Sequence, residues 1–108
     1  MNEPADAASP PDQPPPAAAP IVRVLEIVNS KGLHARASAK FVQTVERYDA
    51  AVTVTRGHET VGGTSIMGLM MLSAGPGTSI TVAATGAQAA EVMAALETLV
   101  AGGFGEED

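Results

Sequence analysis

Cysteine is absent from this 108-residue sequence, and basic residues are scarce, with six Lys and Arg against 12 Asp and Glu. Without cysteine there can be no disulfide, no thiolate metal ligand and no cysteine nucleophile. The formal charge of −6 at pH 7 argues against nucleic-acid binding, which normally requires a basic surface. No apolar run approaches the roughly 20 residues that cross a bilayer, and the acidic start of the chain does not resemble a secretory signal. These absences favour a cytoplasmic protein with no nucleic-acid partner and no membrane insertion.

Proline and negative charge are concentrated at the ends of the chain. Residues 1–20 contain seven of the eight prolines and no basic residue, whereas residues 21–105 contain six basic and six acidic residues. A Pro/Ala-rich segment has too little apolar surface to offset the entropy lost on ordering. We therefore expect a disordered tail over 1–20, one folded domain over 21–105, and a short acidic C-terminal end over 106–108.

Hydrophobic periodicity within 21–105 predicts alternating short strands and helices. Strands are expected over 21–28, 51–56, a short segment ending near 62–63, and 79–84, and helices over about 34–48, 66–72 and from 86 onward. This β-α-β-β-α-β-α order predicts an α+β domain, with a four-stranded sheet covered on one side by helices. Because aromatic residues are few, we expect an aliphatic core filled in part by methionine.

His34 is the strongest candidate for chemistry. It lies where the predicted first helix begins, just after Gly32 and two residues before Arg36. A helix start carries unpaired N–H groups and partial positive charge, and so suits an anion. An imidazole and a guanidinium there would suit a phosphoryl carrier, although the residues alone favour an ordinary histidine at a helix N-cap. The second histidine, His58, is expected to be a solvated turn residue, and no ligand spacing indicates a metal site.

A second candidate is the apolar segment that follows Ser65. It has no polar residue between Ile66 and Leu72, so some of Ile66, Met67 and Met70 must face outward. An exposed Met-rich patch is typical of a partner surface, while packing into the core is the alternative. Ser65 is expected to be either a plain helix cap or a site of modification.

Both candidate segments resemble a known family. The run GLHARASAKFV at 32–42 resembles the active-site segment of HPr, the phosphocarrier of the phosphoenolpyruvate-dependent phosphotransferase system. The run GTSIMGLM at 63–70 resembles its regulatory-serine segment, and AGPG at 74–77 resembles the turn that follows. The 31 positions between His34 and Ser65 also fit, and the resemblance covers about 21–101.

The resemblance implies an open-faced β-sandwich of four antiparallel strands covered on one side by three helices. His34 would accept a phosphoryl group on Nδ1 from phosphorylated enzyme I and pass it to an enzyme IIA-type acceptor. Arg36 would hold the phosphoryl oxygens, together with the backbone N–H groups of Ala35 and Arg36. No cofactor is implied, and a monomer is expected because successive partners must reach the same face.

The resemblance also assigns roles to the second segment. Ser65 would be phosphorylated by an HPr kinase/phosphorylase, which would weaken transfer through His34. Ile66, Met67 and Met70 would form the docking patch.

Ala37 marks a departure from the family, whose members usually carry proline at this position; the helix start is therefore expected to be looser. Ala37 and the run at 62–71 look more like the regulatory, nitrogen-related branch found in alphaproteobacteria. The alternative function is a small ligand-sensing regulatory domain with the same element order and no phosphotransfer. That alternative explains the Gly-rich loop but not His34 and Arg36 together with the Met patch.

Overall fold

The computed structural model describes residues 19–106 of the chain. The expected disordered tail over 1–20 therefore lies outside the described residues, apart from Ala19 and Pro20. Of the acidic end over 106–108, only Glu106 is described.

The elements follow the expected order. In chain order they are β2 (Ile21–Glu26), α1 (Ala35–Glu46), β3 (Ala51–Arg56), β4 (Glu59–Gly62), α2 (Ile66–Met71), β5 (Ser79–Thr85), α3 (Ala89–Ala101) and the short 3₁₀ turn η1 (Gly103–Gly105). The last helix begins at Ala89 instead of near residue 86 because Gly86 has a φ of +114°, which no α-helical residue adopts.

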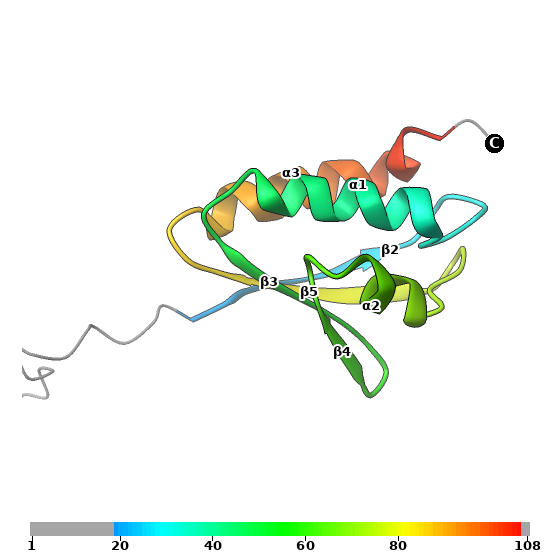
Figure 1. Cartoon of the computed structure of the whole chain (residues 1–108), viewed down its shortest axis with the longest axis horizontal. Helices are drawn as coiled ribbons and strands as arrows, with labels where there is room; N and C mark the ends of the chain where they lie inside the picture. Colours follow the sequence, from blue (N-terminus) through cyan, green and yellow to red (C-terminus); the bar gives the residue numbers. More distant parts are fainter. Residues whose placement is uncertain (1–18, 107–108) are drawn as a thin grey trace, which may run out of the picture.

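The four strands form one antiparallel sheet in the order β2-β5-β3-β4. Figure 1 shows α1 and α3 lying side by side along one face of this sheet, with α2 near the start of α1. The predicted α+β architecture, four antiparallel strands covered on one side by three helices, is confirmed. Among residues 19–106, no helix is long and apolar enough to cross a membrane.

The core lies between the sheet and the helices. Alternate residues of the central strands point into it, and Val54 and Val82 are fully buried. From α1, Ala37, Phe41 and Val45 pack against them, as the four-residue spacing predicts. Burying a side chain such as Phe41 or Val45 contributes about 1.5–3 kcal/mol to folding, so these contacts hold α1 against the sheet.

The composition of the core differs from the expectation of a Met-filled interior. Among the described residues, Met93 is the only buried methionine, whereas Met67 and Met71 on α2 are each 68% exposed. The largest fully buried side chains are instead Phe41 and Phe104. Phe104 reaches the interior because η1 turns the chain back toward the core after α3 ends.

Candidate functional site

His34 occupies the N-cap position of α1, where the sequence places it. Its backbone is extended, its side chain makes no capping hydrogen bond, and its carbonyl accepts the first helical bond, from Ser38 N–H at 2.9 Å. The ring is therefore available for other contacts. The N–H groups of Ala35 and Arg36 precede that first bond and have no helical acceptor. The helix is regular from Ala35 onward even though residue 37 is alanine.

The loop before His34 is held against the turn that follows α2. Gly32 has a φ of +63°, and a Cβ added there would collide with the carbonyl oxygen of Ala74. Leu33 N–H donates to that same oxygen at 3.0 Å, while His34 N–H donates back to the Gly32 carbonyl at 2.9 Å. Only glycine satisfies both the left-handed backbone and the close approach. The position of His34 is therefore set by backbone contacts on both sides of Leu33.

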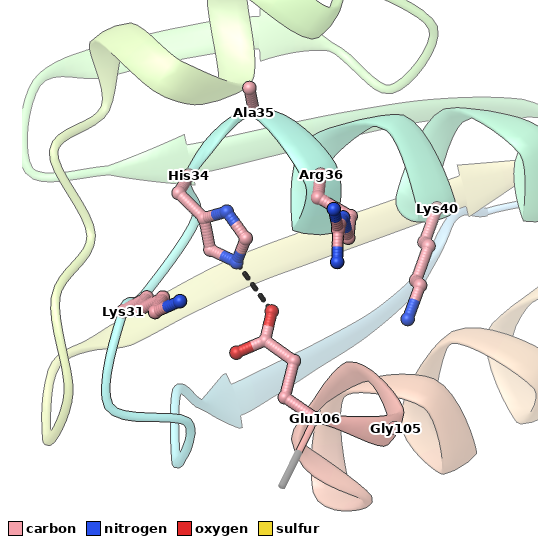
Figure 2. Close-up of a pocket in the computed structure, with 7 residues that line it drawn as sticks. All are labelled: Lys31, His34, Ala35, Arg36, Lys40, Gly105 and Glu106. Carbon is pink, nitrogen blue, oxygen red and sulfur yellow. Dashed lines mark hydrogen bonds and ion pairs between the residues drawn. The ribbon is translucent and has the colours of Figure 1, made fainter. Parts of the chain in front are cut away.

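An open pocket of about 600 Å³ surrounds the His34 ring. Figure 2 shows its lining, which consists of Lys31, His34, Ala35, Arg36, Lys40, Gly105 and Glu106. His34 and Arg36, which the sequence singled out, thus face one pocket. Three of the lining residues are cations and one is an anion, so the pocket favours a negatively charged ligand. Within the described part of the chain, no group of three or more His, Asp or Glu residues could hold a metal ion.

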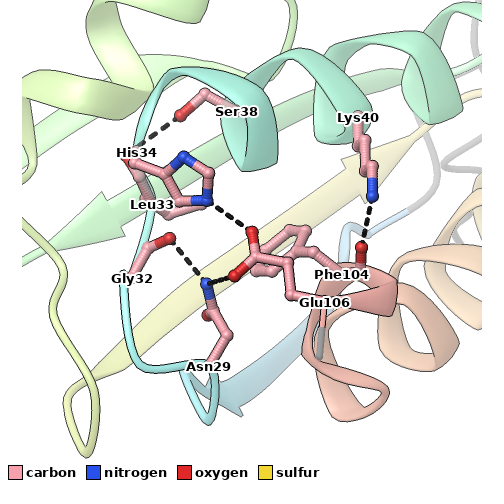
Figure 3. Close-up of polar contacts among 8 residues, drawn as sticks. All are labelled: Asn29, Gly32, Leu33, His34, Ser38, Lys40, Phe104 and Glu106. Carbon is pink, nitrogen blue, oxygen red and sulfur yellow. Dashed lines mark hydrogen bonds and ion pairs between the residues drawn. The ribbon is translucent and has the colours of Figure 1, made fainter. Parts of the chain in front are cut away.

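Glu106 is the residue that sequence analysis missed. Its Oε2 contacts Nε2 of His34, and its Oε1 accepts a hydrogen bond from Nδ2 of Asn29 at 3.1 Å (Figure 3). The same Nδ2 donates to the Gly32 carbonyl at 2.9 Å, and Asn29 is only 1% exposed. The bonds from His34 and then Asn29 lower the pKa of Glu106 below its usual 4.5, and the charges of His34 and Lys31 act in the same direction. Glu106 is therefore ionised at neutral pH.

An ionised carboxylate can only accept hydrogen bonds, so Nε2 of His34 must be the donor. In the neutral imidazole, the proton then resides on Nε2 and Nδ1 carries the lone pair. Nδ1 has no hydrogen-bond partner among residues 19–106. In Figure 2 it lies on the side of the ring nearer to Ala35. The arrangement presents a nucleophilic nitrogen beside the unpaired N–H groups of the first helical turn.

Glu106 reaches the pocket through a short C-terminal strap, residues 102–106. Its three central residues, Gly103, Phe104 and Gly105, all have positive φ, between 59° and 71°. The buried Phe104 ring anchors the strap, and Lys40 Nζ donates to the Phe104 carbonyl at 2.6 Å. In the sequence, an aromatic residue between two glycines follows an amphipathic helix. That pattern was the available signal that the chain folds back onto the domain after the helix.

Ser65 caps the second candidate segment, as predicted. Its Oγ accepts from Gly68 N–H at 2.9 Å, and the side chain is exposed. The predicted outward residues Ile66, Met67 and Met70 are 40%, 68% and 38% exposed. We call these three residues the docking patch, after the role that the resemblance implies for them; Met71 is also exposed and was not singled out. Because α2 packs against α1, the docking patch and the His34 pocket are carried on adjoining helices. His58 is exposed in the turn between β3 and β4, as expected.

Comparison with known proteins identifies the family. The family described as "PTS HPr component phosphorylation site" matches residues 21–102. This chain belongs to the HPr family. The match includes both segments that carry the candidate residues, and it weighs against the ligand-sensing alternative.

Named members of the HPr family are similar over most of the domain. The phosphocarrier protein HPr of Neisseria meningitidis is 52% identical over 82 residues, which cover 76% of this chain and 92% of the relative. The HPr of Cupriavidus necator is 45% identical over 80 residues, covering 74% and 90%. Both are betaproteobacterial proteins, so they do not single out the alphaproteobacterial branch.

Solved HPr structures share the fold. A crystal structure of HPr from Bacillus anthracis superimposes with a TM-score of 0.73 at 35% identity and covers 77% of this chain and 99% of that protein. The structure of HPr-C-His from Thermoanaerobacter tengcongensis gives a TM-score of 0.77 at 36% identity and covers 82% and 99%. The agreement includes the strand order and the placement of the helices on one face.

Proposed function

We propose that this protein is a phosphocarrier of the phosphotransferase system, with His34 as the residue that is phosphorylated. One observation carries the proposal: Nε2 of His34 is held by Glu106, which leaves Nδ1 as the nucleophilic nitrogen at the start of α1. The donor would be phosphorylated enzyme I and the acceptor an enzyme IIA-type protein. Membership of the HPr family supports both partners.

The transfer step follows from this geometry. The lone pair of Nδ1 attacks phosphorus, a new N–P bond forms, and the N–P bond of the donor's phosphohistidine breaks with its electron pair returning to the donor nitrogen. The incoming group carries close to two negative charges. The free N–H groups of Ala35 and Arg36 can bind its oxygens, and the exposed Arg36 guanidinium, with no partner among the described residues, can do the same. Lys31 adds positive charge from the facing loop.

Intact mass spectrometry tests this function directly. Incubation with enzyme I, Mg²⁺ and phosphoenolpyruvate should add one phosphate, which brief acid treatment removes. The variant His34→Ala should not be labelled, whereas the matched control His58→Ala, at the exposed turn, should be labelled like the wild type. Labelling of the His34→Ala variant would refute the assignment of His34.

We also propose that Ser65 is a regulatory phosphorylation site for an HPr kinase/phosphorylase. The support is its exposure and its position directly before the docking patch. A phosphate on Ser65 would place nearly two negative charges beside apolar side chains that a partner must bury. Phosphorylation would therefore weaken docking, and with it the transfer through His34.

The docking patch, Ile66, Met67 and Met70, is proposed to bind enzyme I and the acceptor in turn. Use of one face by successive partners favours a monomer, and a relay between such partners favours the cytoplasm. Ala37 and the run at 62–71 support a place in the nitrogen-regulatory branch. Transfer to a regulatory acceptor in preference to a sugar-transport acceptor, measured with purified proteins of both kinds, would test that assignment.

A further inference from the structure

The carboxylate of Glu106 makes two contacts that differ in kind. Oε2 contacts Nε2 of His34, the nitrogen that does not react, and Oε1 is held by the amide of Asn29. The orientation of that amide is fixed, because both groups facing Nδ2, the Gly32 carbonyl and Glu106, are hydrogen-bond acceptors. Asn29 is buried, so it forms a rigid support for the carboxylate.

The C-terminal strap brings Glu106 to this position at a cost in backbone energy. Phe104 has a φ of +59°, a left-handed conformation that costs a non-glycine residue about 1–2 kcal/mol. Such a conformation persists only where surrounding contacts enforce it. Here the buried Phe104 ring and the Lys40 hydrogen bond supply those contacts. Within residues 19–106, the result of this folding is to deliver one carboxylate to the His34 ring.

We propose that Glu106 is a positioning residue for phosphoryl transfer, which holds the proton of His34 on Nε2 so that Nδ1 is the nucleophile. The proposal rests on the phosphocarrier function proposed above. It assigns Glu106 a role through His34 and no direct contact with the phosphoryl group.

The same contact stabilises the product of the transfer. When the Nδ1 lone pair forms the new bond to phosphorus while Nε2 keeps its proton, the ring acquires positive charge. The Glu106 carboxylate faces that charge through Nε2–H, much as a buried carboxylate supports the histidine of a catalytic triad. Among the described residues, Glu106 is the only carboxylate that lines the pocket, opposite Lys31, Arg36 and Lys40.

The amide variant Glu106→Gln distinguishes two roles of Glu106: setting the tautomer of His34, and merely holding the strap in place. Asn29 Nδ2 can only donate, so the glutamine must turn its carbonyl oxygen toward Asn29 and its NH₂ group toward His34. That NH₂ group donates to Nε2, which moves the ring proton onto Nδ1 and blocks the nucleophile. Glu106→Ala, in contrast, removes the partner of Nε2, so that no contact at Nε2 favours either tautomer of the ring. The isosteric variant should therefore transfer more slowly than the truncated one.

The test combines ¹⁵N NMR of the neutral His34 ring with single-turnover phosphorylation at saturating phosphorylated enzyme I. We expect the Nε2–H form in the wild type and a rise of the Nδ1–H form in Glu106→Gln. The transfer rate of that variant should be lower by about 10-fold to 100-fold, the loss seen when a partner that orients a metal-bound histidine is removed. Glu106→Ala should lie between the two. Glu107→Gln removes the same charge one residue along the chain and should match the wild type.

Two results would overturn the proposal. One is a wild-type ring tautomer and transfer rate in Glu106→Gln. The other is a rate that falls more in Glu106→Ala than in Glu106→Gln in parallel with thermal stability, which would assign Glu106 to the fold alone. Failure of the phosphocarrier function itself would look different, because the wild-type protein would then take up no phosphate.

Discussion

Gly32 lies directly against the carbonyl of Ala74, the same oxygen that accepts a hydrogen bond from Leu33. The loop that carries His34 is thereby fixed to the turn that follows α2. The run at 32–42 and the AGPG turn at 74–77, both of which resemble HPr, are thus joined in space by a backbone contact, and the site histidine and the docking patch are built on one connected support. The contact leaves no room for a side chain at residue 32.

Gly32→Ala is expected to destabilise the protein well beyond the effect of backbone strain. The matched control is Gly57→Ala, because Gly57 has the same φ of +63° but nothing within 4 Å of an added Cβ. Strain alone should cost about 1–2 kcal/mol in Gly57→Ala. Gly32→Ala should lose at least about 2 kcal/mol more, in the range of overpacked sites. Urea unfolding of both variants measures the difference, and equal losses would contradict the contact with Ala74.

Met67→Ala should weaken binding to enzyme I without changing stability. Met67 is 68% exposed, so its truncation leaves no cavity, but a partner that buries it loses about 1–3 kcal/mol, or roughly 5-fold to 150-fold in affinity. Val24→Ala is the control, since Val24 is 67% exposed and lies on β2, at the sheet edge opposite β4, the strand that α2 contacts. Titration calorimetry with enzyme I measures both. Equal affinities for the two variants would show that enzyme I does not use the docking patch.

Ser65→Asp should slow phosphoryl uptake at His34 while the helix cap is kept. Aspartate and asparagine both cap helices well, so Ser65→Asn serves as the neutral control of similar shape. We expect an increased KM for phosphorylated enzyme I in Ser65→Asp and a nearly unchanged KM in Ser65→Asn. The same increase in both variants would indicate that the serine hydroxyl matters and negative charge does not.

The Glu106 contact should make stability depend on pH in the acidic range. The hydrogen bonds from His34 and Asn29 lower the pKa of Glu106 in the folded state below its usual 4.5. A lowered folded-state pKa means that the contact contributes its full stability above about pH 4.5 and loses it as the pH falls through the folded-state pKa. The wild type should therefore exceed Glu106→Gln in unfolding free energy at pH 7, and the gap should close toward pH 3.

Urea unfolding between pH 7 and 3 measures this gap. Glu91→Gln removes the same charge at an exposed position in the first turn of α3 and provides the control. The difference in unfolding free energy between Glu91→Gln and the wild type should change far less with pH. A gap for Glu106→Gln that stays constant over this range would contradict a carboxylate contact with His34.

The fold could be predicted because its signals are local. Alternation in 51–56 and 79–84 and the four-residue spacing of Ala37, Phe41 and Val45 each specify an element and its buried face. The end of the first strand was less well predicted, since Ile27 is paired with the turn before β5, through Thr78 O and Gly77 N–H, and lies outside the ladder itself. Apolar character alone does not distinguish a residue of the strand ladder from a residue that is paired with a turn.

The sequence predicted the site residues at the start of α1 but not the one from the C-terminal strap. His34 and Arg36 lie two residues apart, so a short motif reveals them. Glu106 lies 72 residues from His34 in the sequence. Its position depends on a left-handed turn, which hydrophobic periodicity does not predict. By sequence, Glu106 belongs to the acidic end with Glu107 and Asp108, because charge alone does not distinguish a carboxylate that contacts an imidazole from one that contacts water.

The separation of 72 residues between His34 and Glu106 also ties the site to the folding of the whole domain. A contact between such distant parts of a chain carries a large loop-closure cost, so we expect it to form late in folding. Local opening of the strap would expose Phe104 to solvent and break the contact between His34 and Glu106, while the sheet stays intact. A molecule that is newly made, damaged or partly open would thus lack the Glu106 contact, and it should take phosphoryl groups from the donor more slowly than a fully folded copy.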